Sequence, residues 1–581
     1  MKIHFKYSLL AIVAASLSLQ SCLDLDPQDQ LGGDKMWANA TEYKQFANNF
    51  YGWTRDFGSN DNGPHSDSRS DLVTFATPNV YSKGTNTVPT GDGNYTNNYA
   101  HIRRCNLLLQ NAANYSNPSE IAEYVGDAYF FRAYAYFELL QIYGDAIIVT
   151  EPIDVTSGQL QAKRNDRKDV ARFITSDLTK AIDLLPKYAD IPAADDGHVS
   201  KEAAEAFLSR VALYEGTWQK FHNGDATLAD SLLNVSAKAA KTVIDGKQFY
   251  LYGTQGASVA LGDSAQKYMF ILENEKSNPA GLQKESNHEY IFRRLHDTNL
   301  STVGLNITHG YVDNVMWVTR NFANLYLCQD GLPISKSKEF QGYAKRNSEF
   351  QNRDNRMKYS LLTPGQYYWT NDNPHTTWDW VKDIKPNGGN GVIYVDGHGS
   401  GYNNQKWGSE RAMTDALEGY DYPVIRYAEV LLNYAEAVYE RDGHISDADL
   451  DISLNLVRRR ANPNMPKLSN AFVSSNGLDM REEIRRERTV ELYLEGFRVD
   501  DLKRWNTAVQ TMNQPLLGVK YTGTEFQSNW GSSNQPSQLK DSEGCLIMDD
   551  NRQWSEKNLL YPIPSDQLQL NPNLEQNPGW K

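Results

Sequence analysis

Cysteine is scarce in this sequence, and so are clusters of positive charge. Four cysteines among 581 residues are too few for a disulfide framework. The chain has 58 Lys and Arg residues against 72 Asp and Glu residues, a formal net charge of −14, and no long basic run. Because phosphate binding needs a cationic footprint, this composition argues against nucleic acid as the main partner. It also disfavours a strongly anionic ligand, unless a local basic pocket offsets the acidic average.

The usual catalytic signatures are missing as well. His288 and Glu289 form no zinc-binding HExxH motif, because Phe292 stands where the second His belongs. No nucleophile elbow and no GxxxxGK[ST] phosphate loop occurs. Asp92 begins a stretch that is similar to a calcium loop, but Arg103 takes the place of the closing Glu. A structural calcium held by scattered loop oxygens stays open as an alternative, and no other cofactor is expected.

No hydrophobic run is long enough to cross a bilayer, which needs ~20 apolar residues. Residues 1–21 instead read as a signal peptide, with Lys2 and Lys6 before a short apolar stretch. Leu19 three positions before Cys22 resembles a bacterial lipoprotein cleavage box. We therefore expect lipidation of Cys22 and anchoring at a membrane surface, followed by a tether over residues 22–35. The alternative is a conventional secretory cleavage site with an incidental cysteine.

Helical periodicity dominates two separated blocks, at about residues 36–250 and 421–513. Helices come in consecutive pairs joined by short turns, and small residues occur where helices must approach closely. The residues placed to begin or cap helices are Asn39 or Thr41, Ser119, Ser200 and Asp479. This arrangement is typical of stacked helical hairpins such as tetratricopeptide arrays, although no strict 34-residue period survives. The helices are expected at residues 41–51, 99–113, 120–143, 169–185, 200–214, 227–244, 425–439, 448–461, 480–494 and 497–512.

Helical periodicity fails between the two blocks, from about residue 251 to 420. This insert is rich in Gly, Asn, Pro and aromatic residues, and residues 367–407 alone hold eight Tyr and Trp residues. Aromatic rings in a polar context suit sugar binding, because the C–H face of a sugar lies well on a Trp or Tyr ring. An irregular segment, residues 514–581, follows the second block.

The charged stretch at residues 481–504 invites a catalytic interpretation, because it contains pairs of carboxylates. Glu487, Glu491 and Glu495 repeat every four residues, however, and Arg485, Arg488, Arg498 and Arg504 lie close by in the sequence. That pattern is better explained by an ion-pair network that locks helices together.

Several motifs together resemble the SusD/RagB family of outer-membrane nutrient-binding lipoproteins. The resemblance covers nearly the whole mature chain and includes its ordered series of motifs. They are Cys22–Asp29, Phe131–Leu139 with Tyr143–Asp145, Ser200–Gly216, Arg426–Ala437, Val457–Ala461, Glu487–Trp505, Tyr561–Pro564 and Asn571–Trp580.

The resemblance implies a fold and a role. The fold is mainly α, with tetratricopeptide-like helix pairs forming a right-handed superhelical scaffold and a loop-rich aromatic half that carries the ligand, in one domain over residues 36–581. Members of the family are understood to capture oligosaccharide or polysaccharide at the cell surface, lipid-anchored in the outer membrane, and to deliver it to a SusC-like TonB-dependent transporter. Most are not enzymes.

The candidate ligand-binding residues are aromatic residues of the insert and of the polar loop at residues 58–98, with one carboxylate. The alternatives are a peptide-binding relative in the same role, which would rely more on backbone hydrogen bonds, and a glycoside hydrolase, for which no carboxylate spacing speaks. The candidates are Asp67, Tyr81, Tyr95, Trp317, Trp369, Trp378, Trp380 and Tyr394.

Overall fold

A computed structural model describes most of the chain beyond the expected tether. The described residues are 36–58, 63–222, 224–309, 316–345, 347–363, 367–368, 376–377, 399–411, 414, 416–530, 536 and 538–581. Cys22 and the expected signal peptide and tether lie outside them. No helix among the described residues is both long enough and apolar enough to span a membrane.

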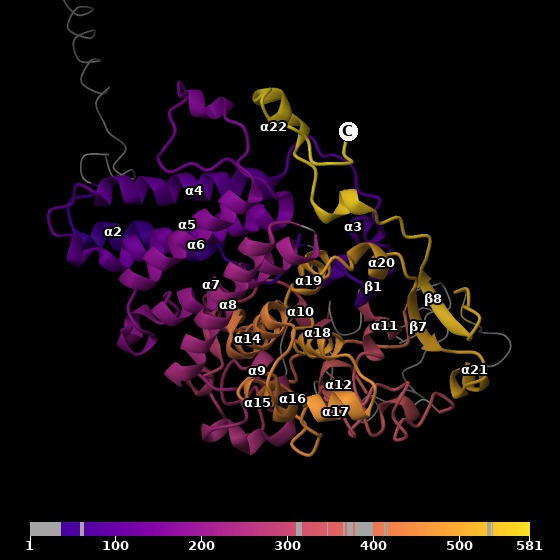
Figure 1. Ribbon diagram of the computed structural model, residues 1–581. Coiled ribbons are helices and arrows are strands. Elements are labelled where there is room, and N and C mark those ends of the chain that lie inside the picture. The colour runs from indigo at the N-terminus through magenta and orange to yellow at the C-terminus, as the bar shows by residue number, and fades with distance from the viewer. Residues whose placement is uncertain are drawn as a thin grey trace, which may run out of the picture.

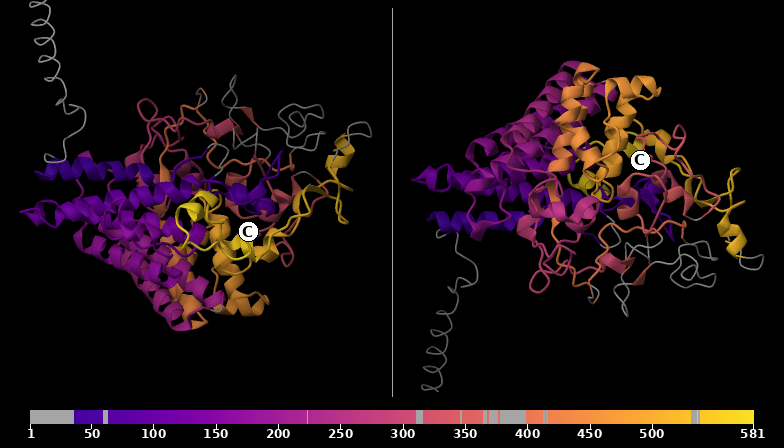
Figure 2. Two further views of the ribbon diagram at one scale, coloured as in Figure 1. Left: turned by 90° about the horizontal axis from the view of Figure 1, so that it is seen from above. Right: turned by 90° about the horizontal axis from the view of Figure 1, so that it is seen from below.

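The first helical block is a stack in which each long helix packs against the next (Figure 1). The expected N-caps Asn39 and Ser200 are confirmed, since each side chain accepts a hydrogen bond from a backbone N–H of the first turn. The cap expected at Ser119 is wrong, because the helix begins at Ala122, after Ile121, and has no side-chain cap. In both views of Figure 2 the helices of the second block lie against this stack. The long helices of the first block are α2 (Ala40–Asn48), α4 (Gly93–Ala112), α5 (Ala122–Tyr143), α6 (Arg167–Leu184), α7 (Lys201–Phe221) and α8 (Ala226–Gly246).

Helix α4 begins six residues before the start expected from the sequence, at Gly93 and not at Tyr99. The Asp92 side chain accepts a hydrogen bond from the backbone N–H of Asn94, so the stretch that is similar to a calcium loop is a helix cap. Tyr143, the last residue of α5, donates its hydroxyl to the other carboxylate oxygen of Asp92 at 2.6 Å. This contact ties the start of α4 to the end of α5.

The second block begins with strand β6 and helix α14, which packs against α7 and α8. The N-cap expected at Asp479 is confirmed for α18. The single helix expected over residues 497–512 is instead two short helices, because Asn506 adopts a left-handed φ of 57°. The helices of the second block are α14 (Tyr427–Asp442), α15 (Asp447–Asp451), α16 (Leu454–Arg460), α17 (Asn470–Ser475), α18 (Met480–Glu491), α19 (Arg498–Arg504) and α20 (Ala508–Met512).

Short antiparallel strand pairs and short helices form the part of the molecule outside the two helical blocks. The strands are β1 (Val73–Phe75) with β3 (Met316–Val318), β2 (Tyr290–Arg294) with β6 (Tyr422–Arg426), β4 (Tyr367–Tyr368) with β5 (Thr376–Thr377), and β7 (Leu516–Lys520) with β8 (Cys545–Asp549). The short helices are α3 (Val80–Lys83), α9 (Ala265–Phe270), α10 (Ile307–His309), α11 (Arg320–Ala323), α12 (Asn355–Ser360), α21 (Glu525–Trp530) and α22 (Ser565–Leu570).

Two large hydrophobic clusters follow this division. The first joins α2–α8 to α14, α16 and the C-terminal segment, and the second joins β1, β2, β3, α9 and β7. Strand pair β2–β6 connects the halves, since β2 precedes most of the insert and β6 follows it. The three cysteines beyond the expected cleavage site are buried free thiols, as expected. That residues 36–581 form a single domain stays a prediction.

Candidate ligand-binding site

Four of the candidate aromatic residues cannot be placed. Trp369, Trp378, Trp380 and Tyr394 lie outside the described residues, so their role stays a prediction.

Three other candidates lie in the interior, which corrects the expectation that they face a ligand. Tyr95 is 5% exposed and packs against Tyr99 and Tyr143. Trp317, in β3, is 2% exposed. The Asp67 carboxylate is fully buried and accepts a hydrogen bond from the backbone N–H of Leu494 at 2.6 Å. Burial of apolar rings and satisfaction of a backbone donor explain these positions.

Tyr81 is half-buried, and its ring is already covered. It stacks on Tyr561 with the ring centroids 5.1 Å apart, and the Arg69 guanidinium lies 3.7 Å from its centroid. Asp71, in the same polar loop, accepts two hydrogen bonds from Arg498, at 2.8 and 2.9 Å. The structure therefore does not bring the four described candidates, Asp67, Tyr81, Tyr95 and Trp317, together at one open surface.

A cavity of about 280 Å³ lies beside the first half of α4 and combines polar and aromatic walls. Three segments line most of it: residues 53–58 after α2, residues 63–66, and one face of α4. Glu138 of α5 and the backbone around Gly496 contribute to it as well. We refer to this cavity as the α4 pocket.

The aromatic residues that line the α4 pocket are Trp53, Phe57, Tyr134, Trp407 and Tyr422. Tyr134 and Trp407 are buried, and Phe57 packs edge-on against Trp407 and Tyr422. The ring of Trp53 is largely covered as well. His101 stacks on it with centroids 4.1 Å apart and ring planes 10° apart, and Phe50 lies 4.6 Å away. Little of the indole face is left for a sugar ring. Recognition in this pocket must therefore depend on hydrogen bonds more than on stacking.

The polar wall is a row of uncharged side chains on one face of α4. Asn94, Asn97, Asn98 and His101 follow at helical spacing and all line the pocket. Sequence reasoning missed this row because it looked for aromatic rings. The repeated Asn residues and His101 at the start of an Asp-capped helix were the available signal.

Ion pairs fix the positions of charged side chains that line the pocket. Arg55 donates from Nε to Glu138 Oε1 at 3.0 Å, and the two ring nitrogens of His65 lie 2.9 Å from Glu138 Oε2 and 2.5 Å from Asp500 Oδ2. Burial raises the pKa of Glu138, but the charges of Arg55 and His65 outweigh it and hold this pKa at about 2. Among the described residues, the carboxyl groups that line the pocket belong to Glu138 and Asp56, and both are engaged in such pairs.

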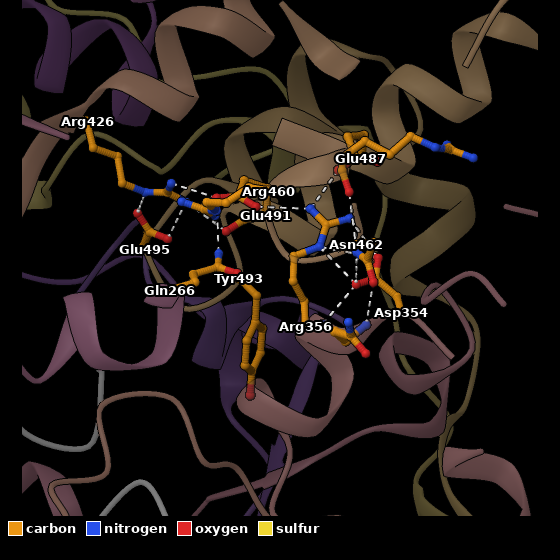
Figure 3. Close-up of polar contacts among 12 residues, drawn as sticks. Gln266, Asp354, Arg356, Arg426, Arg460, Asn462, Glu487, Glu491, Tyr493 and Glu495 are labelled. Atoms are coloured by element: carbon orange, nitrogen blue, oxygen red, sulfur yellow. Dashed lines mark hydrogen bonds and ion pairs between the residues drawn. The ribbon is translucent and has the colours of Figure 1, made fainter. Parts of the chain in front are cut away.

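The charged stretch of α18 is an interior ion-pair network, as expected (Figure 3). Glu491 accepts from Arg426 at 2.7 Å, Arg460 at 2.5 Å and Gln266 at 3.1 Å on one oxygen, and from Arg356 at 3.0 Å on the other. Gln266 and Arg356 belong to the insert, and Arg426 and Arg460 follow it, so the network joins the insert to the second helical block. Burial opposes ionisation, but the three arginines hold the pKa of Glu491 well below its ordinary value.

No group of three or more His, Cys, Asp or Glu side chains among the described residues is arranged to hold a metal ion. A second cavity, of about 610 Å³, lies on the other side of α4, where Tyr99, Ile102, Ile147 and Leu574 give it mostly hydrophobic walls. Tyr95 lines this second cavity too. Its polar lining includes Gln159, Gln161 and Asn571, whose amide nitrogens already donate to Glu151, Leu570 and Ala162.

Two protein-family models match this chain, and several known proteins are similar to it. The SusD family model matches residues 271–580, and a family described as starch-binding and associating with the outer membrane matches residues 32–213. A SusD-like protein of Bacteroides ovatus is 22% identical over 434 residues, 73% of this chain and 64% of that protein, so the match spans slightly less than two thirds of the relative. SusD-like protein P2 of Formosa agariphila is 24% identical over 83% of this chain and 79% of its own length.

Solved structures share the fold. A SusD-like carbohydrate-binding protein of Bacteroides fragilis superimposes with a TM-score of 0.73 at 20% identity, covering 93% of this chain and all of that one. Surface glycan-binding protein A of Bacteroides fluxus superimposes with a TM-score of 0.59 at 17% identity, covering 94% of this chain and all of that one. At such identities the likeness concerns the fold.

Proposed function

Because the chain belongs to the SusD family, we propose that it is a cell-surface glycan-binding lipoprotein. In this role it captures oligosaccharide or polysaccharide and delivers it to a partner TonB-dependent transporter in the outer membrane. It binds its ligand without cleaving it.

The observation that carries the glycan proposal is the row of amide and imidazole groups in the α4 pocket. An amide side chain offers donors and an acceptor together, which matches a sugar hydroxyl that donates and accepts. The side chains of Asn97 and His101 have no hydrogen bond to any other described residue, so their polar atoms are available. The pocket carboxylates Asp56 and Glu138 are held in ion pairs, which argues against acid–base cleavage.

The test is calorimetric titration with a panel of oligosaccharides, alongside an assay for released reducing sugar. We expect binding to one class of glycan and no release of reducing ends. Binding of peptides in place of glycans, or glycan cleavage, would contradict the proposal.

We further propose that the insert supplies a stacking platform from Trp369, Trp378, Trp380 and Tyr394. Loss of one stacked ring costs about 1–3 kcal/mol where bases stack on aromatic side chains, and a sugar on Trp belongs to the lower half of that range. Trp369→Ala, Trp378→Ala and Trp380→Ala, titrated singly, should include at least one variant with clearly weaker binding and an unchanged melting temperature. Unchanged affinity in all three variants would remove the insert tryptophans from the site.

Anchoring is proposed to depend on Cys22. The Cys22→Ala protein should appear in the soluble fraction or be mislocalised, because the thiol that carries the lipid is gone. Outer-membrane fractionation and surface labelling of intact cells measure this directly. A variant that partitions and labels like the wild type would show that Cys22 is not the anchor.

A further inference from the structure

The one Lys or Arg side chain among the described residues that line the α4 pocket is already paired. This residue is Arg55, and it pairs with Glu138. Behind the wall, Arg294 and His296 both pair with Asp56. A carboxylate or sulfate entering the pocket would have to displace a carboxylate of the protein to gain an ionic partner.

The side chains free to meet a ligand are uncharged. Asn94 and Asn98 keep local hydrogen bonds on their amide nitrogens, to Asp92 and to the Asn94 carbonyl respectively, which leaves the side-chain oxygen of Asn98 as an acceptor. Asn97 is exposed and has both its donors and its acceptor free of other described residues.

His101 does not supply a cation either. Burial against Trp53 lowers its pKa to about 4, and the positive charge of Arg104 acts in the same direction. Arg104 itself lies one helical turn further along α4 and is not among the residues that line the pocket. At neutral pH the imidazole therefore offers one donor and one acceptor, as an amide does.

We infer that the α4 pocket selects uncharged sugar units and discriminates against units that carry a carboxylate or sulfate. The inference rests on the proposed glycan-binding function and specifies its substrate class. Neutral hydroxyls can exchange water for amide and imidazole partners at little cost, whereas an anion would lose hydration without gaining an unpaired cation. The net charge of −14 on the whole chain disfavours the approach of polyanions in the same sense.

The experiment compares two panels on the full mature chain: neutral gluco-, xylo-, manno- and galacto-oligosaccharides, and oligogalacturonides with sulfated galactans. Each is titrated against the wild type, Asn97→Ala and the matched control Gln110→Ala, which changes an exposed side chain on α4 outside the pocket. We define binding through the pocket as binding whose affinity falls at least tenfold in Asn97→Ala and is unchanged in Gln110→Ala. We expect such binding for neutral sugars alone.

Three outcomes are distinguishable. Asn97-dependent binding of an acidic oligosaccharide would overturn the selectivity while leaving the glycan-binding function intact. Glycan binding that is insensitive to Asn97→Ala would overturn the assignment of the pocket. No binding of any glycan would overturn the proposed function and the inference with it.

A gain-of-charge variant gives an independent check. Asn97→Arg places an unpaired guanidinium at the exposed end of the row, and because position 97 is exposed on a helix the fold should tolerate it. Affinity for an oligogalacturonide should rise at least tenfold at low salt and fall again as salt is added. An unchanged preference in a variant with a normal melting curve would show that charge does not set the selectivity.

Discussion

At the scale of single residues, Glu491 is the most heavily connected acid described. Glu491→Ala should lower the free energy of unfolding by roughly 3–5 kcal/mol, because it leaves Arg356, Arg426 and Arg460 buried with one fewer partner. Chemical denaturation of the purified protein measures the change. Glu482→Ala, at an exposed position of the same helix, should change stability by no more than about 0.5 kcal/mol.

The same pair of variants separates an architectural from a ligand-binding role. If Glu491→Ala kept wild-type stability and lost glycan binding, the network would belong to a site. We expect the opposite pattern, with stability lost and the affinity of the remaining folded protein retained.

Residue types were readable from the sequence, but residue exposure was not. Trp317 and Tyr95 have the side chains of a sugar platform, yet strand β3 and the α4–α5 contact enclose them. Enclosure depends on partners distant in sequence: the buried Asp67 carboxylate meets the backbone of Leu494. Sequence spacing carries no information on such contacts. The repeat of Glu487, Glu491 and Glu495, by contrast, is local, and its interpretation as a network is confirmed.

At the scale of elements, the start of α4 positions the polar row of the pocket. Asp92→Ala removes the N-cap of α4 and the partner of the Tyr143 hydroxyl, and should cost about 1–2 kcal/mol of stability. Fraying of the first turn would also displace Asn94 and Asn97, so we expect weaker glycan binding, measured by titration well below the melting temperature.

Asp166→Ala is the matched control for that prediction. Asp166 caps α6 through the same kind of bond, to the backbone N–H of Lys168 at 2.8 Å, and does not line the pocket. Its loss should lower stability by about 1 kcal/mol and leave affinity unchanged. Equal loss of affinity in both variants would mean that the effect of Asp92→Ala is a general one.

Helix positions were largely predictable from caps and periodicity, as Asn39, Ser200 and Asp479 show. The errors fall where a local signal has two meanings. Asp92 is compatible with a calcium loop or a helix cap, and the contact with Tyr143 that accompanies the cap is not visible in the sequence. Likewise the break at Asn506 depends on a left-handed backbone that Asn only sometimes adopts.

At the scale of the whole molecule, buried carboxyl groups set how stability depends on pH. Ion pairs overcome burial to hold the pKa of Glu138 and Glu436 at about 2, below their ordinary value of 4.5. The unfolded chain therefore binds protons first as pH falls below 4.5, and this stability is lost toward pH 2. Burial raises the pKa of Asp127 and Glu205 to about 7, so their contribution is lost as pH rises from about 4 to 7.

Together these shifts predict a maximum in melting temperature near about pH 4–5, with one fall below pH 4.5 and another from about pH 5 to 7. Thermal melts across this range test it. Asp127→Asn should flatten the fall above pH 5, because the amide still accepts the hydrogen bond of Tyr51 and no longer titrates. A melting temperature that rises steadily to pH 8 would contradict the prediction.

The network around Glu491 predicts that the folded molecule tolerates a cut in its backbone. Arg356 precedes the segment between Thr363 and Gly399, while Arg426, Arg460 and Glu491 follow it, and the Leu362 backbone N–H donates to the Asn403 carbonyl at 2.9 Å across that segment. Non-covalent contacts among the described residues thus join the two sides of this segment. A molecule cut once there, at an engineered protease site, should remain a two-piece protein that migrates as one species on a native gel and as two under denaturing conditions.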